Sequence, residues 1–502
     1  MEDLYRYVIY VLSALLVLFG GTPRLFDRKS GTALRVLGFA LILAYSSIAI
    51  ENLFAKVLAI SSSIIAAFVT IYTANYAKLK YGFPYLQLLV DAFSLSITYT
   101  FVSRYLIEFV TCWIIAELIG FVLIAFEWFI QGVRGALEAG IRYLLVSMVP
   151  ADITLFTLIA LTGIEKSFTV ELTSIAPAIQ GSLLLTILCI VGFLAKAAVA
   201  PLHFWLPDAH SLAPAPASAM LSGLMVKMGV YGLYLLTLYP IDIRTYAYAL
   251  MICGSITAIY GGVQALAQVD IKRILAYSTI SHTSVMAILL GFSIAFNSVE
   301  ALQAALFYII AHAFFKATLF MDSGVVEIIA HTRDISSLGY ISRLHALEST
   351  TALLAVLSLI GAPPLPGFIA KFTTILSITN KLNVALLAAI LLVVIAIEIA
   401  LSVGYGAKYL LTHFGTSTIK ISLHEGLEKL GLKQLTLPIL ATIVISIAVI
   451  IPVTLLQLIT YAQILLFITA ISAVFLTIIL YTIYRSQKMF RTDESWLGGA
   501  RP

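Results

Sequence analysis

Four lysines of this sequence lie inside long apolar stretches: Lys196, Lys227, Lys316 and Lys371. No arginine lies in the interior of such a stretch. An ammonium group surrounded by hydrocarbon costs several kcal/mol unless it is paired, hydrated or neutralised. A buried lysine can escape this cost by losing its proton, whereas arginine keeps its charge. The asymmetry predicts buried amines to which protons bind and from which they leave.

One carboxylate has a similar setting, because Glu117 lies within an apolar run. A lysine at close range would keep both groups charged, and Lys196 and Lys227 are the candidates. Moving a proton away from Lys196 would then depend on its distance from Glu117, which is a usable switch. The alternative is a static ion pair, although such pairs are seldom better for stability than hydrophobic replacements.

Two histidines extend this set. His312 and Lys316 are four residues apart and therefore share one helix face. A histidine that titrates near neutral pH beside a lysine suits a proton relay. We expect His282 to connect Lys227 to His312 through hydroxyl groups and water. The alternative is that each histidine is a polar group bonded between helices.

The remaining ionisable candidates allow more than one interpretation. Glu398 can pair with Lys371 or mark an exit for protons. Asp322, near the end of a predicted span, fits an interfacial position. Asp208 and His210 follow another span, where anchoring of the chain and ion transfer are both open.

The composition places these residues in a membrane protein. Of 502 residues, 61% are apolar and 11% are charged, against about 25% charged in ordinary globular domains. The net charge of +5 comes from basic residues scattered through short loops, so no nucleic-acid partner is expected. The three cysteines lack metal-ligand spacing, and no nucleotide-binding or haem motif is present, so we expect no metal and no cofactor. Energy must then come from an ion gradient or from another subunit.

The hydropathy pattern predicts an all-α polytopic membrane protein with 14–15 transmembrane helices. Our count is fifteen, with spans near residues 4–20, 33–50, 53–75, 85–103, 105–130, 139–163, 178–201, 214–238, 245–267, 273–296, 300–325, 347–378, 382–411, 435–457 and 461–484. Loops after odd-numbered spans, together with the C-terminal tail, hold most of the Lys and Arg residues. This bias predicts an N-terminus outside the cell and a C-terminus in the cytoplasm.

The sequence also contains an internal repeat. Residues 192–196 (GFLAK) recur 175 positions later as residues 367–371 (GFIAK), and both copies lie beside several prolines. Paired helix interruptions are typical of repeat transporters with sites near the midplane. The two copies fall in the seventh and twelfth spans, an odd separation that predicts inverted repeats.

Four motifs carry a resemblance to a known family: residues 199–211 (VAPLHFWLPDAHS), 268–282 (QVDIKRILAYSTISH), 312–320 (HAFFKATLF) and 361–372 (GAPPLPGFIAKF). They resemble antiporter-like subunits of respiratory complex I, of Mrp-type cation/proton antiporters and of energy-converting membrane hydrogenases. The latter two branches are favoured. The resemblance covers roughly residues 100–415. Asp322 and Glu348 depart from the family pattern.

The resemblance implies two inverted five-helix repeats, each with a broken helix. We expect N-terminal helices over residues 1–84, half-channels over 85–240 and 241–415, and C-terminal helices with a tail over 416–502. It also implies proton-translocating roles for a set of residues on one polar axis: Glu117, Lys196, Lys227, His282, His312, Lys316 and Lys371. Glu398 joins this set from the residue pattern alone.

The expected function is proton translocation, with Na+/H+ exchange as an open possibility, by a subunit of a multisubunit complex in a prokaryotic cell membrane. Its partners would be related antiporter-like subunits, small transmembrane subunits and, in some branches, a peripheral redox arm. Whether the complex is an oxidoreductase stays open, because the chain has no redox or hydrolytic centre of its own. Two alternatives remain: a standalone secondary transporter and a non-conducting scaffold with the same fold.

Overall fold

The computed structural model describes residues 2–173, 183–237, 243–339, 341–382, 386–415 and 432–457. Within these ranges, eleven helical segments are long and apolar enough to cross a membrane, and three shorter apolar helices accompany them. The only extended pairings among the described residues are two isolated bridges, Tyr105 with Glu171 and Asp270 with Asp334. The predicted all-α polytopic fold is therefore confirmed.

The first part of the chain supplies the helices around Glu117 and Lys196. They are α1 (Glu2–Gly20), α2 (Lys29–Ala49), α3 (Leu53–Lys80), α4 (Tyr85–Val102), α5 (Leu106–Ile124), α6 (Phe126–Gln131), α7 (Arg134–Tyr143), a π-helical turn η1 (Leu144–Met148), α8 (Val149–Thr162), α9 (Ile164–Thr169) and α10 (Leu183–Lys196). The α7–η1–α8 stretch is one continuous span.

The second part supplies the remaining polar residues. Its helices are α11 (Leu206–Leu212), α12 (Ala215–Met220), the π-helical turn η2 (Leu221–Met225), α13 (Val226–Leu236), α14 (Ile243–Ala267), α15 (Ile271–Ala295), α16 (Val299–Ala330), α17 (Ile341–Leu344), α18 (Ala346–Ile360), α19 (Pro366–Thr379), α20 (Leu386–Phe414) and α22 (Leu432–Gln457).

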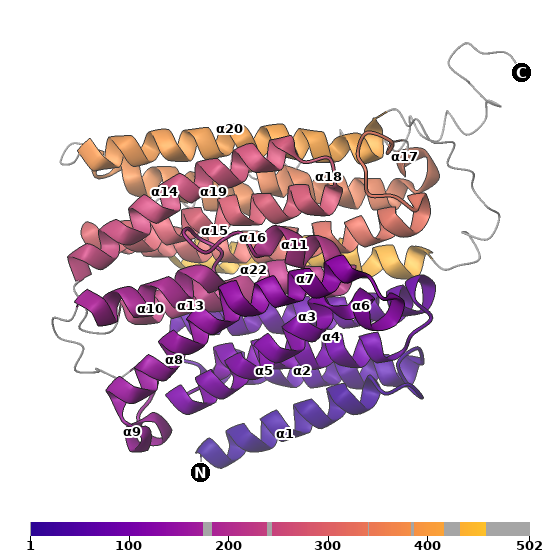
Figure 1. The fold of residues 1–502 in the computed structure, drawn as a ribbon, viewed down its shortest axis with the longest axis horizontal. Helices are drawn as coiled ribbons and strands as arrows, with labels where there is room; N and C mark the ends of the chain where they lie inside the picture. Colours follow the sequence, from indigo (N-terminus) through magenta and orange to yellow (C-terminus); the bar gives the residue numbers. More distant parts are fainter. Residues whose placement is uncertain are drawn as a thin grey trace, which may run out of the picture.

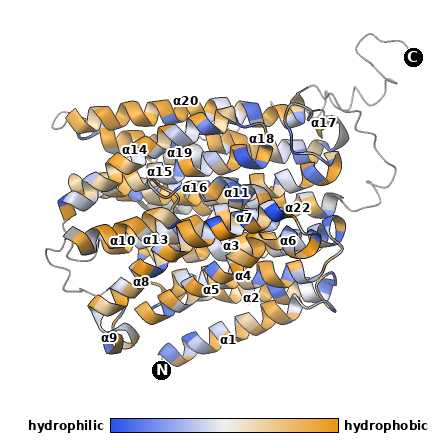
Figure 2. Cartoon of the chain, viewed as in Figure 1, coloured by the Kyte–Doolittle hydropathy of each residue, from blue (hydrophilic) through white to orange (hydrophobic). Residues whose placement is uncertain are grey.

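The long helices run roughly side by side, with the N-terminal part of the chain on one side of the bundle and α14 and α20 on the other (Figure 1). Helix α16 lies at the centre, where its most apolar 18-residue window is 100% buried, whereas the corresponding window of α1 is 22% buried. The outer helices show mostly hydrophobic ribbon, and hydrophilic colours gather toward their ends (Figure 2). This distribution suits a bundle surrounded by lipid, in which polar residues at depth face other helices.

The seventh predicted span is interrupted after Lys196. We expected this span over residues 178–201, but α10 ends at Lys196 and the chain resumes as a helix only at Leu206. Ala198 adopts a positive φ of 56°, and Pro201 follows, so a regular helix cannot continue. The break places the Lys196 side chain at a helix terminus inside the protein.

The twelfth predicted span is interrupted in the corresponding place. One span was expected over residues 347–378, and the structure divides it into α18 and α19, separated by residues 361–365. Gly361 has a φ of +86°, and Pro366 occupies the first position of α19, where proline needs no helical partner for its nitrogen. Both GF(L/I)AK copies therefore lie on the helix next to a break, but the first precedes its break and the second follows it.

Fourteen of the fifteen predicted spans correspond to described helices, and the span at 461–484 lies outside the described residues. The expected exclusion of arginine from the interior is wrong, because Arg6 of α1 and Arg35 are both buried. Arg35, which the charge pattern assigned to a loop, lies in α2 and is completely buried. It donates hydrogen bonds to the Gly20 and Phe26 carbonyls and pairs with buried Asp91 at 3.7 Å. Arginine is thus tolerated inside this bundle where a carboxylate and backbone oxygens neutralise it.

Candidate functional site

Glu117 and Lys196 form a buried ion pair. The Lys196 Nζ atom lies 2.5 Å from Glu117 Oε1, and both side chains have no exposed surface. Helix α5 supplies Glu117, and the end of α10 supplies Lys196. The Lys196 ammonium also donates to the Tyr143 hydroxyl at 3.2 Å. Of the two lysines proposed as partners of Glu117, the structure therefore selects Lys196.

A second carboxylate, Asp152, lies in the electrostatic environment of this pair. It comes from the first turn of α8 and is only partly buried. Asp152 was not among the residues predicted from the sequence, although it lies within the predicted span over residues 139–163. A carboxylate inside an apolar run is the signal that pointed to Glu117, and the same signal is present at Asp152.

Lys227 and His312 form the second close contact. Lys227 Nζ lies 2.5 Å from His312 Nδ1 and donates to the Ser222 carbonyl at 2.6 Å, with both side chains fully buried. Ser222 belongs to the π-helical turn η2, whose altered backbone pairing directs that carbonyl to the lysine five residues later. His312 comes from the central helix α16.

His282 continues the contact from the other side of His312. The two rings are 5.5 Å apart between centroids. His282 Nδ1 lies 2.8 Å from the Tyr308 hydroxyl and 3.1 Å from Glu398 Oε1, and its Nε2 lies 3.0 Å from the Tyr405 hydroxyl. The expected order is therefore wrong, because Lys227 contacts His312 directly and His282 follows. The packing of α13 and α15 against α16 decides this order.

Glu398 pairs with His282, and no ion pair within 4 Å joins it to Lys371 among the described residues. The two groups still interact electrostatically, and Lys371 Nζ donates to the Ser402 hydroxyl at 2.6 Å. Ser402 lies four residues after Glu398 on α20, so it faces the same side of that helix. The Ser402 hydroxyl group thus lies next to the space between Lys371 and Glu398.

Lys316 lies on the same face of α16 as His312 but bonds to α15. Its Nζ atom donates to the Leu275 carbonyl at 3.0 Å and makes a short contact with the Ser278 hydroxyl. The Ser278 hydroxyl group is therefore a hydrogen-bond partner of Lys316. This lysine is a branch beside the Lys227–His312–His282 contacts.

Two glycines hold the lysines in place. A Cβ atom on Gly229 of α13 would lie 2.3 Å from the Ala197 nitrogen, so only glycine lets α13 approach the break after Lys196. A Cβ atom on Gly361 would lie 2.8 Å from Lys371 Cδ, and its φ of +86° also disfavours other residues. Close packing at both breaks, of backbone against backbone at Gly229 and of the Lys371 side chain against Gly361, therefore positions both lysines.

The connection after the first break contributes an anchor and a buried histidine. Asp208 bonds to Arg273 at 2.6 Å and contacts Arg142, so it joins α11 to α15 and α7 at the edge of the bundle. The His210 side chain is fully buried, its two ring nitrogens have no hydrogen-bond partner within the described residues, and Lys316 and Lys227 are its charged neighbours. Asp208 is therefore an anchor, whereas His210 faces the central lysines.

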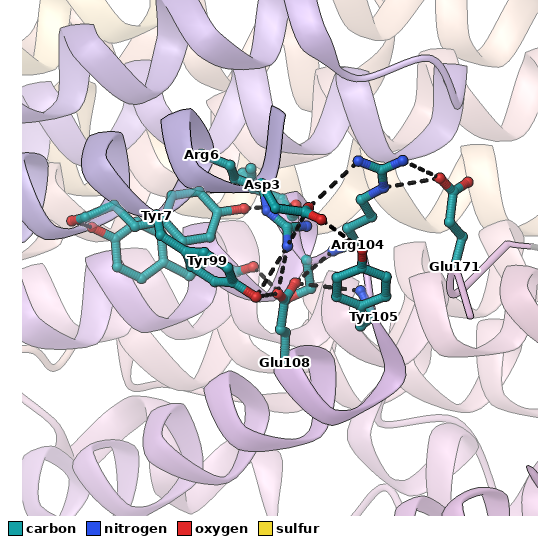
Figure 3. A network of polar contacts seen from close by, with 11 residues as sticks. Asp3, Arg6, Tyr7, Tyr99, Arg104, Tyr105, Glu108 and Glu171 are labelled. Atoms are coloured by element: carbon teal, nitrogen blue, oxygen red, sulfur yellow. Dashed lines mark hydrogen bonds and ion pairs between the residues drawn. The ribbon is translucent and has the colours of Figure 1, made fainter. Parts of the chain in front are cut away.

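A polar network joins side chains near the start of α1 to side chains near the start of α5 (Figure 3). Arg6 Nη2 and the Tyr7 hydroxyl donate to Glu108 Oε1 at 2.7 and 2.5 Å, and Arg104 pairs with Glu171. The network ties the beginning of α1 to the α4–α5 connection. Several of its side chains are partly exposed, which is typical of an anchor between helix ends.

The buried contacts form two groups: Glu117–Lys196–Tyr143, and Lys227–His312–His282–Glu398 with Lys371 nearby. Within the described residues, Lys196 and Lys227 make no direct contact, and water would have to join the two groups. Nitrogen and oxygen atoms at hydrogen-bond distance can pass protons. No set of three or more His, Cys, Asp or Glu residues in the described part of the chain is placed to hold a metal ion.

A transmembrane family model described as NADH:quinone oxidoreductase/Mrp antiporter matches residues 105–399. Hydrogenase-4 component B of Escherichia coli is 34% identical over 213 residues, covering 40% of this chain and 31% of that protein. A Na+/H+ antiporter subunit of Alkalihalophilus pseudofirmus is 37% identical over 223 residues, covering 41% and 28%. The matched segment thus spans less than a third of either relative. An Mrp complex from Dietzia sp. has the same fold, with a TM-score of 0.74 and 24% identity over 98% of this chain and 56% of that one.

Proposed function

Because the chain belongs to the NADH:quinone oxidoreductase/Mrp antiporter transmembrane family, we propose that it is an antiporter-like subunit that moves protons across a prokaryotic cell membrane. The observation that carries this proposal is the presence of the two groups of buried ionisable residues described above, from Glu117 to Lys371, which together we call the row. A static bundle would gain little from so many buried charges, because their desolvation is expensive.

In the proposed mechanism, Glu117 controls the charge of Lys196. While the carboxylate stays 2.5 Å from the ammonium, the proton on Lys196 is held. Separation of the pair, or neutralisation of Glu117, makes the charged amine costly and drives its proton toward Lys227. Asp152 can compete for the same positive charge.

The second group then carries the proton onward. Lys227 passes it to His312. The path continues through the His312 Nε2 atom, which has no hydrogen-bond partner in the described part of the chain, and through the neighbouring His282 ring. Glu398 stabilises a protonated His282, and Lys371 provides the last amine. Lys316 lies beside the path, on the face of α16 that carries His312, so a proton gained or lost by Lys316 would tune the transfer. Residues 85–240 and 241–415 would form the two half-channels, related as inverted repeats.

The finer aspects of the proposal concern partners and ions. We propose that related antiporter-like and small transmembrane subunits surround the chain, since the Dietzia sp. structure is of an Mrp complex. The similarity to a Na+/H+ antiporter subunit supports exchange of Na+ for H+. The similarity to a hydrogenase component supports a complex that also contains a peripheral redox arm. The distribution of basic residues supports an outside N-terminus and a cytoplasmic C-terminus.

The test measures proton flux in membrane vesicles that contain the assembled complex. Lys196→Met is expected to reduce flux to background while the complex still assembles. The control is Lys78→Met, because the side chain of Lys78 is 64% exposed. Normal flux in the Lys196 variant contradicts the mechanism. Flux from the purified chain alone would instead indicate a standalone transporter, and absence of flux from the native complex would indicate a scaffold.

A further inference from the structure

A third group of buried ionisable residues lies outside the row, where α16, α18 and α20 meet. Asp322, Glu348 and His413 are all completely buried. The position of Asp322 near the end of a predicted span fits a place at the membrane interface, and in the structure neighbouring helices bury its side chain completely. The proposed transport mechanism uses none of these three residues.

The charge of Asp322 is held by two donors. Its Oδ2 atom accepts a hydrogen bond from the Tyr409 hydroxyl at 2.6 Å and lies 3.2 Å from His413 Nε2. His413 Nδ1 in turn lies 3.0 Å from the Ser349 hydroxyl. Asp322 Oδ1 has no hydrogen-bond partner among the described residues. The Oδ2 atom of Asp322 thus has hydrogen-bond partners, whereas its Oδ1 atom is available to accept a hydrogen bond.

Glu348 has a different environment. Its carboxyl group lies beside Asp322 and Thr436, yet neither oxygen accepts a hydrogen bond of normal geometry within the described residues. No salt-bridge partner reaches it in that part of the chain. An ionised carboxylate here would meet both the desolvation cost of burial and repulsion from Asp322. Two adjacent buried carboxyl groups avoid this by keeping one proton between them.

The other ionisable groups near Asp322 and Glu348 do not remove the repulsion between these two carboxyl groups. Tyr72 of α3 donates to the Met321 carbonyl, and Tyr76 and Glu327 lie farther along α3 and α16. Lys80 and Lys272 engage Glu327, at 3.1 and 3.3 Å. Two histidines of the described chain lie at the carboxyl pair: His413 Nε2 contacts Asp322, and His345 Nδ1 accepts a hydrogen bond from the Glu348 backbone nitrogen.

We propose that Asp322 and Glu348 form an additional proton-binding site, in which one exchangeable proton is carried mainly by Glu348. Asp322 is six residues from Lys316 on α16, about 9 Å along the helix axis. The site lies toward the end of α16 that carries the Lys80–Glu327–Lys272 contacts. Its use in transport rests on the proposed function, whereas proton binding itself does not.

The test is infrared difference spectroscopy of the purified complex, titrated in H2O and D2O. The native complex is expected to show a protonated-carboxyl band that shifts on deuteration and changes with pH. Glu348→Gln is expected to lose this band. Asp322→Asn is expected to keep it at a changed frequency, because the neighbouring charge is gone. The control is Glu51→Gln, a change at an exposed carboxylate, which should leave the band unaltered.

Two results overturn the proposal: a native complex without such a band, and a band that survives Glu348→Gln unchanged. If Glu348→Gln fails to assemble, the frequency shift in Asp322→Asn decides the question by itself. Proton flux separates this proposal from the proposed function. A band that behaves as expected in a complex whose flux is insensitive to Lys196→Met would retain the site and reject the transport mechanism.

Discussion

Lys227 Nζ and His312 Nδ1 lie 2.5 Å apart, and neither side chain is exposed. A hydrogen bond between two nitrogens needs one donor and one acceptor, so His312 must present an unprotonated Nδ1 when Lys227 carries its proton. The contact therefore has room for one proton. In the proposed mechanism this single occupancy would make the pair a transfer step, because a proton that arrives on one nitrogen displaces the charge from the other.

The first prediction concerns this pair. His312→Gln removes the ring that continues the path, and we expect proton flux to fall to background while Lys227 keeps its bond to the Ser222 carbonyl. The change is measured as flux in vesicles with matched amounts of assembled complex. His331→Asn, at the exposed end of α16, is the control, because asparagine also tolerates the left-handed backbone there. Equal loss in both variants would show a general effect on folding.

The second prediction separates the electrostatic and transport roles of Glu117 and Lys196. Removing either partner leaves a buried charge unpaired and should destabilise the protein by about 3–5 kcal/mol. The double variant Glu117→Gln/Lys196→Met should recover most of this stability, because neither charge remains. Flux should stay at background in all three. Thermal unfolding in detergent measures the stability, and a double variant that also transports would contradict the assigned roles.

The third prediction concerns Gly361. An alanine there must adopt a φ of +86°, at about 1–2 kcal/mol, and its Cβ would displace Lys371. We expect Gly361→Ala to reduce both stability and proton flux. Gly82→Ala is a matched control, because Gly82 also has a positive φ, 64°, but nothing lies within 4 Å of its added Cβ. Similar stability loss with normal flux in the control would assign the flux effect to Lys371.

The fourth prediction concerns the other buried pair, Arg35 and Asp91. Arg35→Met leaves Asp91 buried with only the Thr70 and Gln87 hydrogen bonds, so we expect about 3–5 kcal/mol of destabilisation. The folded fraction should transport normally, since this pair lies among α2, α3 and α4 and, within the described ranges, contacts none of the proposed transport residues. Unfolding temperature and flux per assembled complex are measured together. Abolished flux at normal assembly would place this pair in the transport machinery.

The helices and the inventory of charged residues followed from local sequence. Long apolar runs specify membrane-spanning helices whatever their neighbours are, and prolines beside residues 196 and 371 marked the two breaks. Buried lysines were recognised because charge inside an apolar run is costly. The same rule would have found Asp152, whereas Arg35 was missed because it lies near a span boundary.

Tertiary packing decided which buried side chains contact one another. Nothing in the sequence distinguishes Lys196 from Lys227 as the partner of Glu117, and the approach of α10 to α5 settles it at 2.5 Å. The order Lys227–His312–His282 and the pairing of Glu398 with His282 depend on which faces of α13, α15, α16 and α20 meet. Asp322 and Glu348 are 26 positions apart in the sequence, and only the packing of α16 against α18 brings their carboxyl groups together. A helix fixes which residues share a face, but only the packed bundle determines which faces touch.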